Sequence, residues 1–345
     1  MSNFNPKFTI TSTILNNVSQ CEVAKAIIEN SPLVPAWERK FQTQALVRSV
    51  HHSTALEGNE LTIDETERII DGEKIDTFRL RDVQEIINYR NVIGFISENK
   101  ETKFTIGFLL KMHSILGHKI LPDKYLGKVR DRNAMIINDQ NLDIVFDPPK
   151  YNEIEDLLDE IVDWDNEVGN TLHPLLRAGI LHYEIVRIHP FADLNGRTAR
   201  SFATWSLYRD GYDIKSFFSL EEHYDQDPKG YYDALDSANK SGDLTDWLTY
   251  FTNGMSKELN KIKEKVWNLS KDRRLRMKVG QVALNERQLL IINTLEAENE
   301  LSNPDFDELF PKISDDTILR DLKDLIEKGI VIKKGRTKGA KYFLA

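Results

Sequence analysis

The stretch from His189 to Arg200, HPFADLNGRTAR, is the most informative part of the chain. It follows Ala178–Ile188 (AGILHYEIVRI), which is apolar on nearly every face and therefore predicts a central helix surrounded by others. A second helix follows, because apolar residues recur at helical spacing after the stretch. Backbone N–H groups near Asn195 and Gly196 would open this second helix, and a helix N-terminus binds anions. The stretch therefore predicts an anion site between two helices.

Four side chains of this stretch suit the binding of a phosphate ester. Arg197 and Arg200 are three residues apart, so they share one helix face and can hold successive phosphates. Asp193 offers the hard oxygen ligand that Mg²⁺ takes when it bridges phosphates. His189 can accept a proton near neutral pH. Taken singly, a histidine at a helix end is more often structural, and an arginine pair is more often a solvated face.

Together these residues resemble the signature of the Fic family of adenylyltransferases, H-P-F-x-[DE]-G-N-G-R-x-x-R. Every defined position matches except Leu194, where the signature has glycine. The similarity covers about Pro35 to Phe251 and includes other family landmarks. These landmarks are Gly127-Lys128-Val129-Arg130, Pro148-Pro149, His173–Ala178 and Asp246-Trp247-Leu248. The resemblance implies an enzyme that moves AMP from ATP, or sometimes another phosphate-linked group, to a Ser, Thr or Tyr hydroxyl of a protein, with Mg²⁺ as cofactor.

The resemblance also implies roles for single residues. His189 would be the catalytic base, Asp193 would hold Mg²⁺ at the α- and β-phosphates, and Arg200 would bind the γ-phosphate. The nucleotide site would further comprise Leu194, Asn195, Gly196, Arg197, Thr198, Tyr231, Tyr232 and Asn239. The last three would lie beside the adenine, although ordinary helix packing explains them equally well. Leucine in place of glycine leaves two outcomes open, an ordinary backbone conformation at Leu194 or weaker nucleotide binding. We expect the loop still to bind phosphate.

A second motif lies upstream, at Ser53-Thr54-Ala55-Leu56-Glu57-Gly58-Asn59. It resembles the family's inhibitory motif, [ST]-x-x-x-E-[GN], placed before the catalytic domain. The resemblance implies that Ser53 and Glu57 belong to a self-inhibitory element and that Glu57 pairs with Arg200. In some relatives the same glutamate positions water for removal of AMP, so the direction of the reaction stays open.

The expected fold is mainly α: a Fic-type helical bundle with a small β-hairpin flap, followed by a C-terminal winged-helix domain. We expect an N-terminal helical region at 1–110, a catalytic core at 111–254, a basic connecting helix at 255–282 and a winged helix at 283–345. The hairpin would join Ala134–Ile137 to Ile144–Phe146 through a turn at Asn138–Asn141. It resembles the family's flap, whose edge can align a protein substrate by strand addition.

Periodicity predicts the remaining elements. Asn152–Val168 is an amphipathic helix. Beyond Asn285 we expect helices at Glu286–Glu298, around Pro304–Phe310 and at Asp315–Lys328, with Ser314 as N-cap and Gly329 after the end. A hairpin of Ile330–Lys334 and Lys341–Leu344 completes this outline of a winged helix. Its wing is basic, with Lys333, Lys334, Arg336, Lys338 and Lys341 and no acid from Gly329 to Ala345.

The charge and cysteine content of the chain limit which binding partners and which cellular compartment we expect. The chain has 345 residues and a formal net charge of −9, so nucleic-acid contact requires a local basic patch such as the wing. The wing could touch the DNA backbone weakly, an acidic partner or a second copy of the chain, which leaves a homo-oligomer open. One cysteine, Cys21, excludes an internal disulfide framework and favours a reducing compartment. We expect a cytoplasmic protein without membrane segments.

Two classes of function remain. The first is an adenylyltransferase inhibited by Glu57, or the corresponding hydrolase that removes AMP. The second is a transcription-linked regulator whose nucleotide site senses without transfer, an alternative that the change at Leu194 strengthens.

Overall fold

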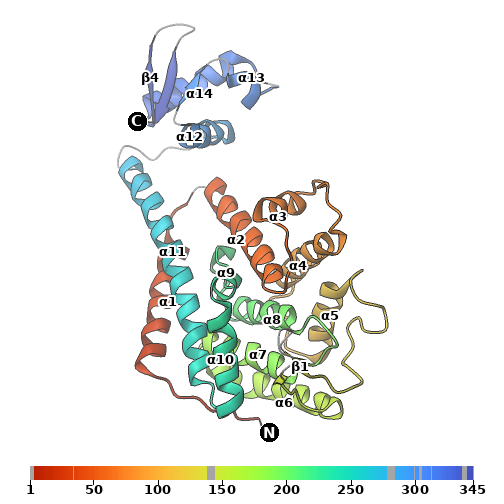
Figure 1. The fold of residues 1–345 in the computed structure, drawn as a ribbon. Helices are drawn as coiled ribbons and strands as arrows, with labels where there is room; N and C mark the ends of the chain where they lie inside the picture. The colour runs from red at the N-terminus through yellow and green to blue at the C-terminus, as the bar shows by residue number, and fades with distance from the viewer. Residues whose placement is uncertain are drawn as a thin grey trace. The chain divides into compact units, whose positions relative to one another are not determined.

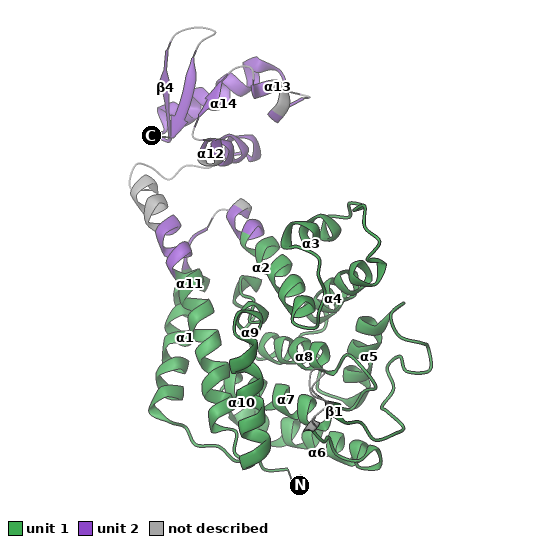
Figure 2. Cartoon of the chain, viewed as in Figure 1, with its two compact units in different colours: residues 1–30, 41–263 green, residues 31–40, 264–345 purple. Residues whose placement is uncertain are grey.

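The computed structural model divides the chain into two compact units, which Figure 2 colours separately. The first comprises residues 1–30 and 41–263, and the second comprises residues 31–40 and 264–345. The structure describes residues 4–33, 35–137, 144–277, 284–298, 300–302, 305–311, 313–335 and 340–344. Each unit has its own buried apolar core.

The first unit is built almost entirely of helices, which confirms the predicted mainly-α class (Figure 1). Its helices are α1 (Ser12–Asn30), α2 (Pro35–Ala55), α3 (Ile63–Ile70), α4 (Leu80–Glu98), α5 (Ile106–Gly117), η1 (Tyr151–Glu153), α6 (Ile154–Glu167), η2 (Gly169–Thr171), α7 (Pro174–Ile188), α8 (Asn195–Arg209), η3 (Ile214–Ser216), α9 (Glu221–Gln226), α10 (Pro228–Ser241) and α11 (Thr245–Met277). Helices α2 and α11 also contribute residues to the second unit. The helix predicted at 152–168 is confirmed as η1 followed by α6.

Helices α7 and α8 form the centre of the first unit. Helix α7 is buried on nearly every face, as its apolar sequence predicted, and it packs along α8. Gly179 lets α11 approach closely, because a Cβ there would lie 2.8 Å from the Leu248 side chain. The Trp247 indole N–H fixes this contact by donating to the Gly179 carbonyl at 2.7 Å. The loop at 189–194 is therefore held between two well-packed helices.

The predicted hairpin is present as two short strands, β1 (Ile136–Ile137) and β2 (Ile144–Phe146). They pair antiparallel, with Ile136 opposite Phe146 and an irregular register beside it. The predicted turn at 138–141 lies outside the described residues. The hairpin leads into Pro148 and Pro149, as expected.

The second unit combines three helices with a small sheet. Its elements are α12 (Glu286–Glu298), β3 (Leu301–Ser302), α13 (Phe306–Leu309), α14 (Asp315–Glu327), β4 (Val331–Lys334) and β5 (Lys341–Leu344). The antiparallel sheet has the order β3-β5-β4, and Leu295, Leu322 and Tyr342 are among the side chains buried in its core. The predicted helices and hairpin are present, whereas β3 was not predicted because two residues carry no strand periodicity. In the basic wing, Arg336 and Lys338 lie outside the described residues.

Helix α11 departs from the predicted organisation. It begins at Thr245 and runs without interruption to Met277. The basic helix expected at 255–282 is therefore the later part of a longer helix as far as residue 277, and residues 278–282 lie outside the described residues. The composition becomes more basic near residue 255, but the helical backbone continues through this point. Among the described helices, none is long and apolar enough to cross a membrane.

Candidate functional site

His189 ends α7 in a left-handed backbone conformation, with φ +50° and ψ +58°. Residues other than glycine adopt this conformation rarely, and they do so disproportionately at functional sites. The His189 Nδ1 atom lies 3.3 Å from the Val186 carbonyl oxygen. Because a carbonyl only accepts hydrogen bonds, Nδ1 carries the proton and Nε2 carries the free lone pair. Burial lowers the pKa of His189 below its usual value, which keeps the imidazole neutral at pH 7 and able to accept a proton at Nε2.

Arg130 holds the backbone around His189. Its Nε donates to the His189 carbonyl at 2.8 Å, and one Nη donates to the Pro149 carbonyl at 2.6 Å. The Arg130 main-chain N–H donates to the Pro190 carbonyl at 2.8 Å. One guanidinium therefore ties the residues that follow the hairpin to the loop that carries His189. The sequence had marked Arg130 as a landmark without assigning it a role.

The loop after His189 closes through Asn195. The Asn195 side chain accepts from the Phe191 N–H and donates to the Phe191 carbonyl, both at 2.9 Å. Leu194 enters α8 with φ +67° and ψ +16°, and only 3% of it is exposed. Of the two outcomes that the sequence left open, an ordinary backbone conformation at Leu194 is therefore wrong. The loop keeps the left-handed geometry that glycine favours, and the leucine side chain packs into the core.

The N-terminus of α8 lies where the sequence predicted an anion site. The helix begins at Asn195, and the first N–H groups of any helix have no partner within the helix. Arg197 is 6% exposed, and its Nη1 lies 3.0 Å from Glu85 Oε1 on α4. The buried Nε of Arg197 has no hydrogen-bond partner in the part of the chain that the structure describes. A buried donor without a partner is costly, which makes Arg197 Nε a candidate donor to a bound anion.

Arg200 lies one turn further along α8 and is 2% exposed. Its Nη2 donates to Glu57 Oε1 at 2.8 Å and to the Ser53 carbonyl at 3.0 Å. Its Nε donates to the Ser53 hydroxyl at 2.9 Å. The Glu57 carboxylate lies over Gly196, where an added Cβ would clash with Glu57 Oε1. The two motifs predicted from the sequence are therefore in direct contact, through Glu57 and Ser53 on one side and Arg200 on the other.

The charges of Glu57 and Arg200 stabilise each other. Burial disfavours both charges, yet Arg200 and Arg197 lower the pKa of Glu57 below its usual value. Glu57 in turn raises the pKa of Arg200 above its usual value. Both groups are therefore ionised at neutral pH. The negative Glu57 carboxylate therefore pairs with the guanidinium of Arg200, to which the resemblance assigns binding of the γ-phosphate.

Glu85 connects the inhibitory motif to the other arginine. Besides pairing with Arg197, it accepts a hydrogen bond from Asn59 Nδ2 at 3.2 Å and one from Arg81 Nε at 3.2 Å. Only 7% of Glu85 is exposed. Asn59 belongs to the quoted motif, but Glu85 was not predicted, because a single acid within an amphipathic helix carries no sequence signal. Its role depends on the packing of α4 against α8.

The Asp193 carboxylate offers the oxygen donors that Mg²⁺ binds. The Asp193 side chain is 49% exposed just before the N-terminus of α8, and Oδ2 lies 3.8 Å from Arg81 Nη2. Its Oδ1 accepts from the Leu194 N–H at 2.7 Å, which orients the carboxylate. Within the described residues there is no group of three or more metal-ligating side chains. One carboxylate nevertheless suits Mg²⁺, which commonly combines one or two protein carboxylates with waters and substrate phosphates.

The remaining predicted nucleotide residues differ in their surroundings. Thr198 is fully buried, and its hydroxyl donates to the Leu194 carbonyl at 2.8 Å, so it supports the loop. Tyr231 on α10 is 1% exposed, and its hydroxyl lies 3.0 Å from His182 Nε2. Tyr232 is 51% exposed. Asn239 accepts from the Tyr183 hydroxyl at 2.9 Å. Of the three α10 residues, Tyr232 has the most surface free for a ligand.

Comparison with known proteins identifies one domain. Residues 103–207 match the model of the Fic/DOC family. A protein adenylyltransferase Fic of Drosophila willistoni is 30% identical over 184 residues, which cover 50% of this chain and 34% of that protein. The protein adenylyltransferase fic-1 of Caenorhabditis elegans is 29% identical over 181 residues, with the same coverage of 50% and 34%. The match thus spans about a third of the length of these relatives.

Solved structures share the fold along more of the chain. A Fic family protein from Desulfovibrio desulfuricans superposes with a TM-score of 0.69 at 23% identity, covering 99% of this chain and 98% of that chain. Residues 134–508 of C. elegans Fic-1 give a TM-score of 0.59 at 24% identity, covering 75% and 73%. These likenesses place the chain in the Fic fold.

Proposed function

We propose that this chain, which carries a Fic/DOC-family domain at residues 103–207, transfers AMP from ATP to a hydroxyl group of a protein. The observation that carries the proposal is the arrangement around the loop at 189–194. A neutral imidazole, a helix N-terminus, two buried arginines and an exposed carboxylate lie on one short segment. Phosphoryl-type transfer needs this positioning and charge neutralisation more than it needs covalent chemistry from the protein.

His189 would act as the general base. Its Nε2 would take the proton from the hydroxyl of the protein substrate while the hydroxyl oxygen attacks the α-phosphorus of ATP. A new bond would form from this oxygen to phosphorus, and the bond to the pyrophosphate leaving group would break. The lowered pKa of His189 keeps Nε2 unprotonated at neutral pH. Arg130 would fix the position of the imidazole through the His189 carbonyl.

The nucleotide phosphates would lie at the N-terminus of α8. Arg197 offers its unpartnered Nε, and Arg200 offers a guanidinium once Glu57 leaves it. Asp193 would hold Mg²⁺, which when bound would neutralise negative charge on the phosphates. Each of these groups is positioned by the same loop and helix, so the phosphates would be held as one rigid set.

Glu57 would inhibit this reaction. It holds Arg200 at 2.8 Å and lies over Gly196, where the γ-phosphate would otherwise sit. ATP could then bind only in a pose with its α-phosphate misaligned. Misplacement of about 1 Å in such a reaction can cost on the order of a hundredfold in rate. This inhibition would therefore reduce the rate more than the affinity for ATP.

The protein substrate would reach the site beside the hairpin of β1 and β2. Arg132, before this hairpin, and Pro149, after it, are both connected through Arg130 to the loop that carries His189. An extended substrate segment could add to a free strand edge by main-chain hydrogen bonds. Such pairing would deliver a Ser, Thr or Tyr hydroxyl without requiring a particular sequence around it.

Incubation with ATP labelled at the α-phosphate and Mg²⁺ tests the proposal. The parent chain and the Glu57→Gly variant should each place label on the protein itself or on proteins of a cell lysate. The His189→Ala variant should lose transfer and keep most of its ATP binding, because the imidazole acts on the hydroxyl. His118→Ala, an exposed histidine at the end of α5, is the matched control and should behave as the parent. Failure of both the parent and Glu57→Gly to transfer label, with ATP binding retained, would favour a nucleotide sensor.

A further inference from the structure

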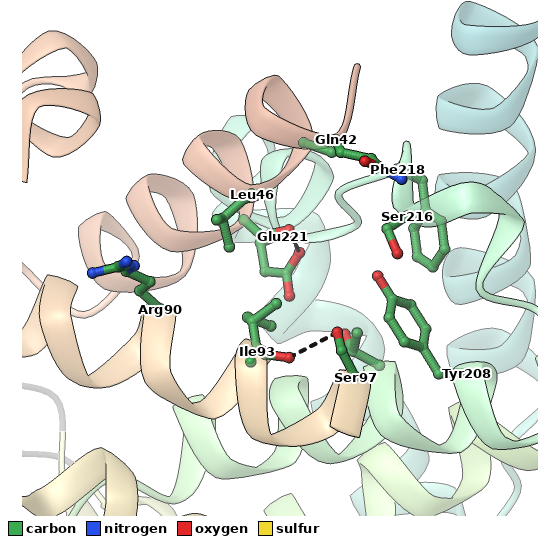
Figure 3. A pocket seen from close by; sticks show the side chains of 13 residues that line it. Gln42, Leu46, Arg90, Ile93, Ser97, Tyr208, Ser216, Phe218 and Glu221 are labelled. Carbon is green, nitrogen blue, oxygen red and sulfur yellow. Dashed lines mark hydrogen bonds between the residues drawn. The ribbon is translucent and has the colours of Figure 1, made fainter. Parts of the chain in front are cut away.

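A cavity of about 260 Å³ lies within the first unit, and no residue of the loop at 189–194 lines it. Helices α2, α4 and α8, the short helix η3 and the start of α9 surround it (Figure 3). Exposed Gln42, Gly94 and Ser97 form its mouth, and buried Tyr208, Phe218 and Glu221 form its floor. None of these residues belongs to the nucleotide site described above.

Gly94 keeps the cavity open on the side of α4. Glycine within a helix lowers stability relative to alanine, so its use there needs a local reason. A Cβ built on Gly94 would meet no atom within 4 Å, which shows that no close packing demands glycine. The missing side chain instead leaves space at the mouth of the cavity.

Glu221 gives the floor a specific chemistry. It is 2% exposed, and its carboxylate accepts hydrogen bonds from the hydroxyls of Ser49 at 3.0 Å, Ser219 at 3.2 Å and Tyr89 at 3.1 Å. Burial raises the pKa of Tyr89 well above its usual value, so the phenol keeps the proton that it donates. Among the residues that the structure describes, no Lys, Arg or His nitrogen lies within 4.0 Å of the Glu221 carboxylate. A buried carboxylate usually has a cationic partner, and this one faces an open cavity.

We propose that this cavity binds a small primary amine with an apolar body, whose ammonium group pairs with Glu221. Most of the exposed lining is apolar and comes from side chains such as Ala45, Leu46 and Ile93, which suits a hydrocarbon or aromatic body. Arg90 also borders the mouth, but Figure 3 shows its side chain extending away from Glu221. The acidic side chain at the floor of the cavity is Glu221, and a positively charged ligand group complements a carboxylate.

The cavity adjoins the part of α2 and α8 that holds Arg200. On α2, Ser49 lines the cavity and Ser53, one turn later, accepts from Arg200 Nε. On α8, Thr204 lines the cavity one turn after Arg200. An amine bound at Glu221 would consequently sit against the same helix faces that carry the contact between Ser53 and Arg200.

Direct binding measurements on the full chain test the proposal independently of AMP transfer. Isothermal titration calorimetry at pH 7 would use 2-phenylethylamine as the probe and 2-phenylethanol as its uncharged analogue. The amine should bind at least about tenfold more tightly than the alcohol, because only the amine can pair with Glu221. Glu221→Gln should remove this difference while leaving alcohol binding unchanged. Asp213→Asn, a neighbouring acid that pairs with Lys100 outside the cavity, is the matched control and should keep the difference.

A variant that fills the space provides the second test. Gly94→Met should abolish binding of both compounds without unfolding the chain, because its Cβ meets no neighbour and α4 gains a better helix former. Equal affinity for the amine and the alcohol, or amine binding that survives Gly94→Met, would overturn the proposal. So would absence of amine binding up to the solubility limit of the probe.

Discussion

Replacing Leu194 by the glycine of the family signature should destabilise the first unit. Leu194 has φ +67°, a conformation that costs an L-residue roughly 1–2 kcal/mol and costs glycine almost nothing. Backbone strain alone therefore predicts a more stable glycine variant. The leucine side chain, however, is only 3% exposed, and removing a buried leucine side chain costs about 2–5 kcal/mol. The loss of packing exceeds the relief of strain, and we expect a net loss of about 1–3 kcal/mol.

Leu194→Ala separates the two contributions. Alanine loses nearly the whole side chain and keeps the strain, so it should be less stable than the glycine variant by about 1 kcal/mol. The expected order of stability is parent, then glycine, then alanine. Native-state hydrogen exchange at increasing urea, read from peptides of α7 and α8, would measure the free energy of unfolding of the first unit separately from the second. ATP affinity of the glycine variant should change less than tenfold, because the loop already has the geometry that glycine would give it.

Two results would refute this reasoning. A glycine variant at least as stable as the parent would show that burial of the Leu194 side chain does not compensate for its backbone conformation. A gain of more than tenfold in ATP affinity would show that leucine distorts the anion site.

Three further predictions concern inhibition, pH and the wing. Glu57→Gly should raise AMP incorporation by at least about tenfold, since it frees Arg200 from a charge-assisted contact worth about 1.5–3 kcal/mol. Arg200→Ala should remove the inhibition without raising the rate. Equal time courses of labelled AMP for Glu57→Gly and the parent would contradict self-inhibition. Burial lowers the pKa of His189 below its usual 6.5. The transfer rate of Glu57→Gly should therefore be constant at neutral pH and fall only at a pH below 6.5, where His189 becomes protonated. A rate that already falls between pH 8 and pH 7 would contradict His189 as the base. Nucleic-acid binding through Lys333 and Lys334 should weaken steeply with salt and depend little on sequence, and absence of DNA binding at low salt in a mobility-shift assay would leave protein contact as the role of the wing.

Much of the fold could be predicted because its signals are local. The apolar run of α7, the helix start at Asn195 and the cap sequence before α14 each depend on a few neighbouring residues. The start of α11 could not be located, because charge changes near residue 255 while helix-forming residues continue on both sides. Strand β3 has only two residues and depends on β5, which lies about forty positions later in the chain.

The candidate site was predictable where one motif carries the chemistry. His189, Asp193, Arg197 and Arg200 lie within one stretch of twelve residues, and the structure brings Glu57 to Arg200 as the resemblance implied. Residues that act by packing from other helices were not predictable. Glu85 approaches Arg197 only because α4 lies against α8, and no sequence pattern records that contact.

The four hydrogen bonds of Arg130 limit how far the hairpin can vary independently of the loop that carries His189. The Arg130 side chain and its main-chain N–H donate to the carbonyls of Arg132, Pro149, His189 and Pro190. The residues on both sides of the hairpin and the loop that carries His189 therefore share one anchoring residue. Under the proposed function, a mutation that loosens the hairpin to admit a new protein would also loosen the position of His189. Broader choice of substrate and fast chemistry would therefore trade against each other in this chain, and variants selected for new protein substrates should keep Arg130 and diversify the hairpin beyond it.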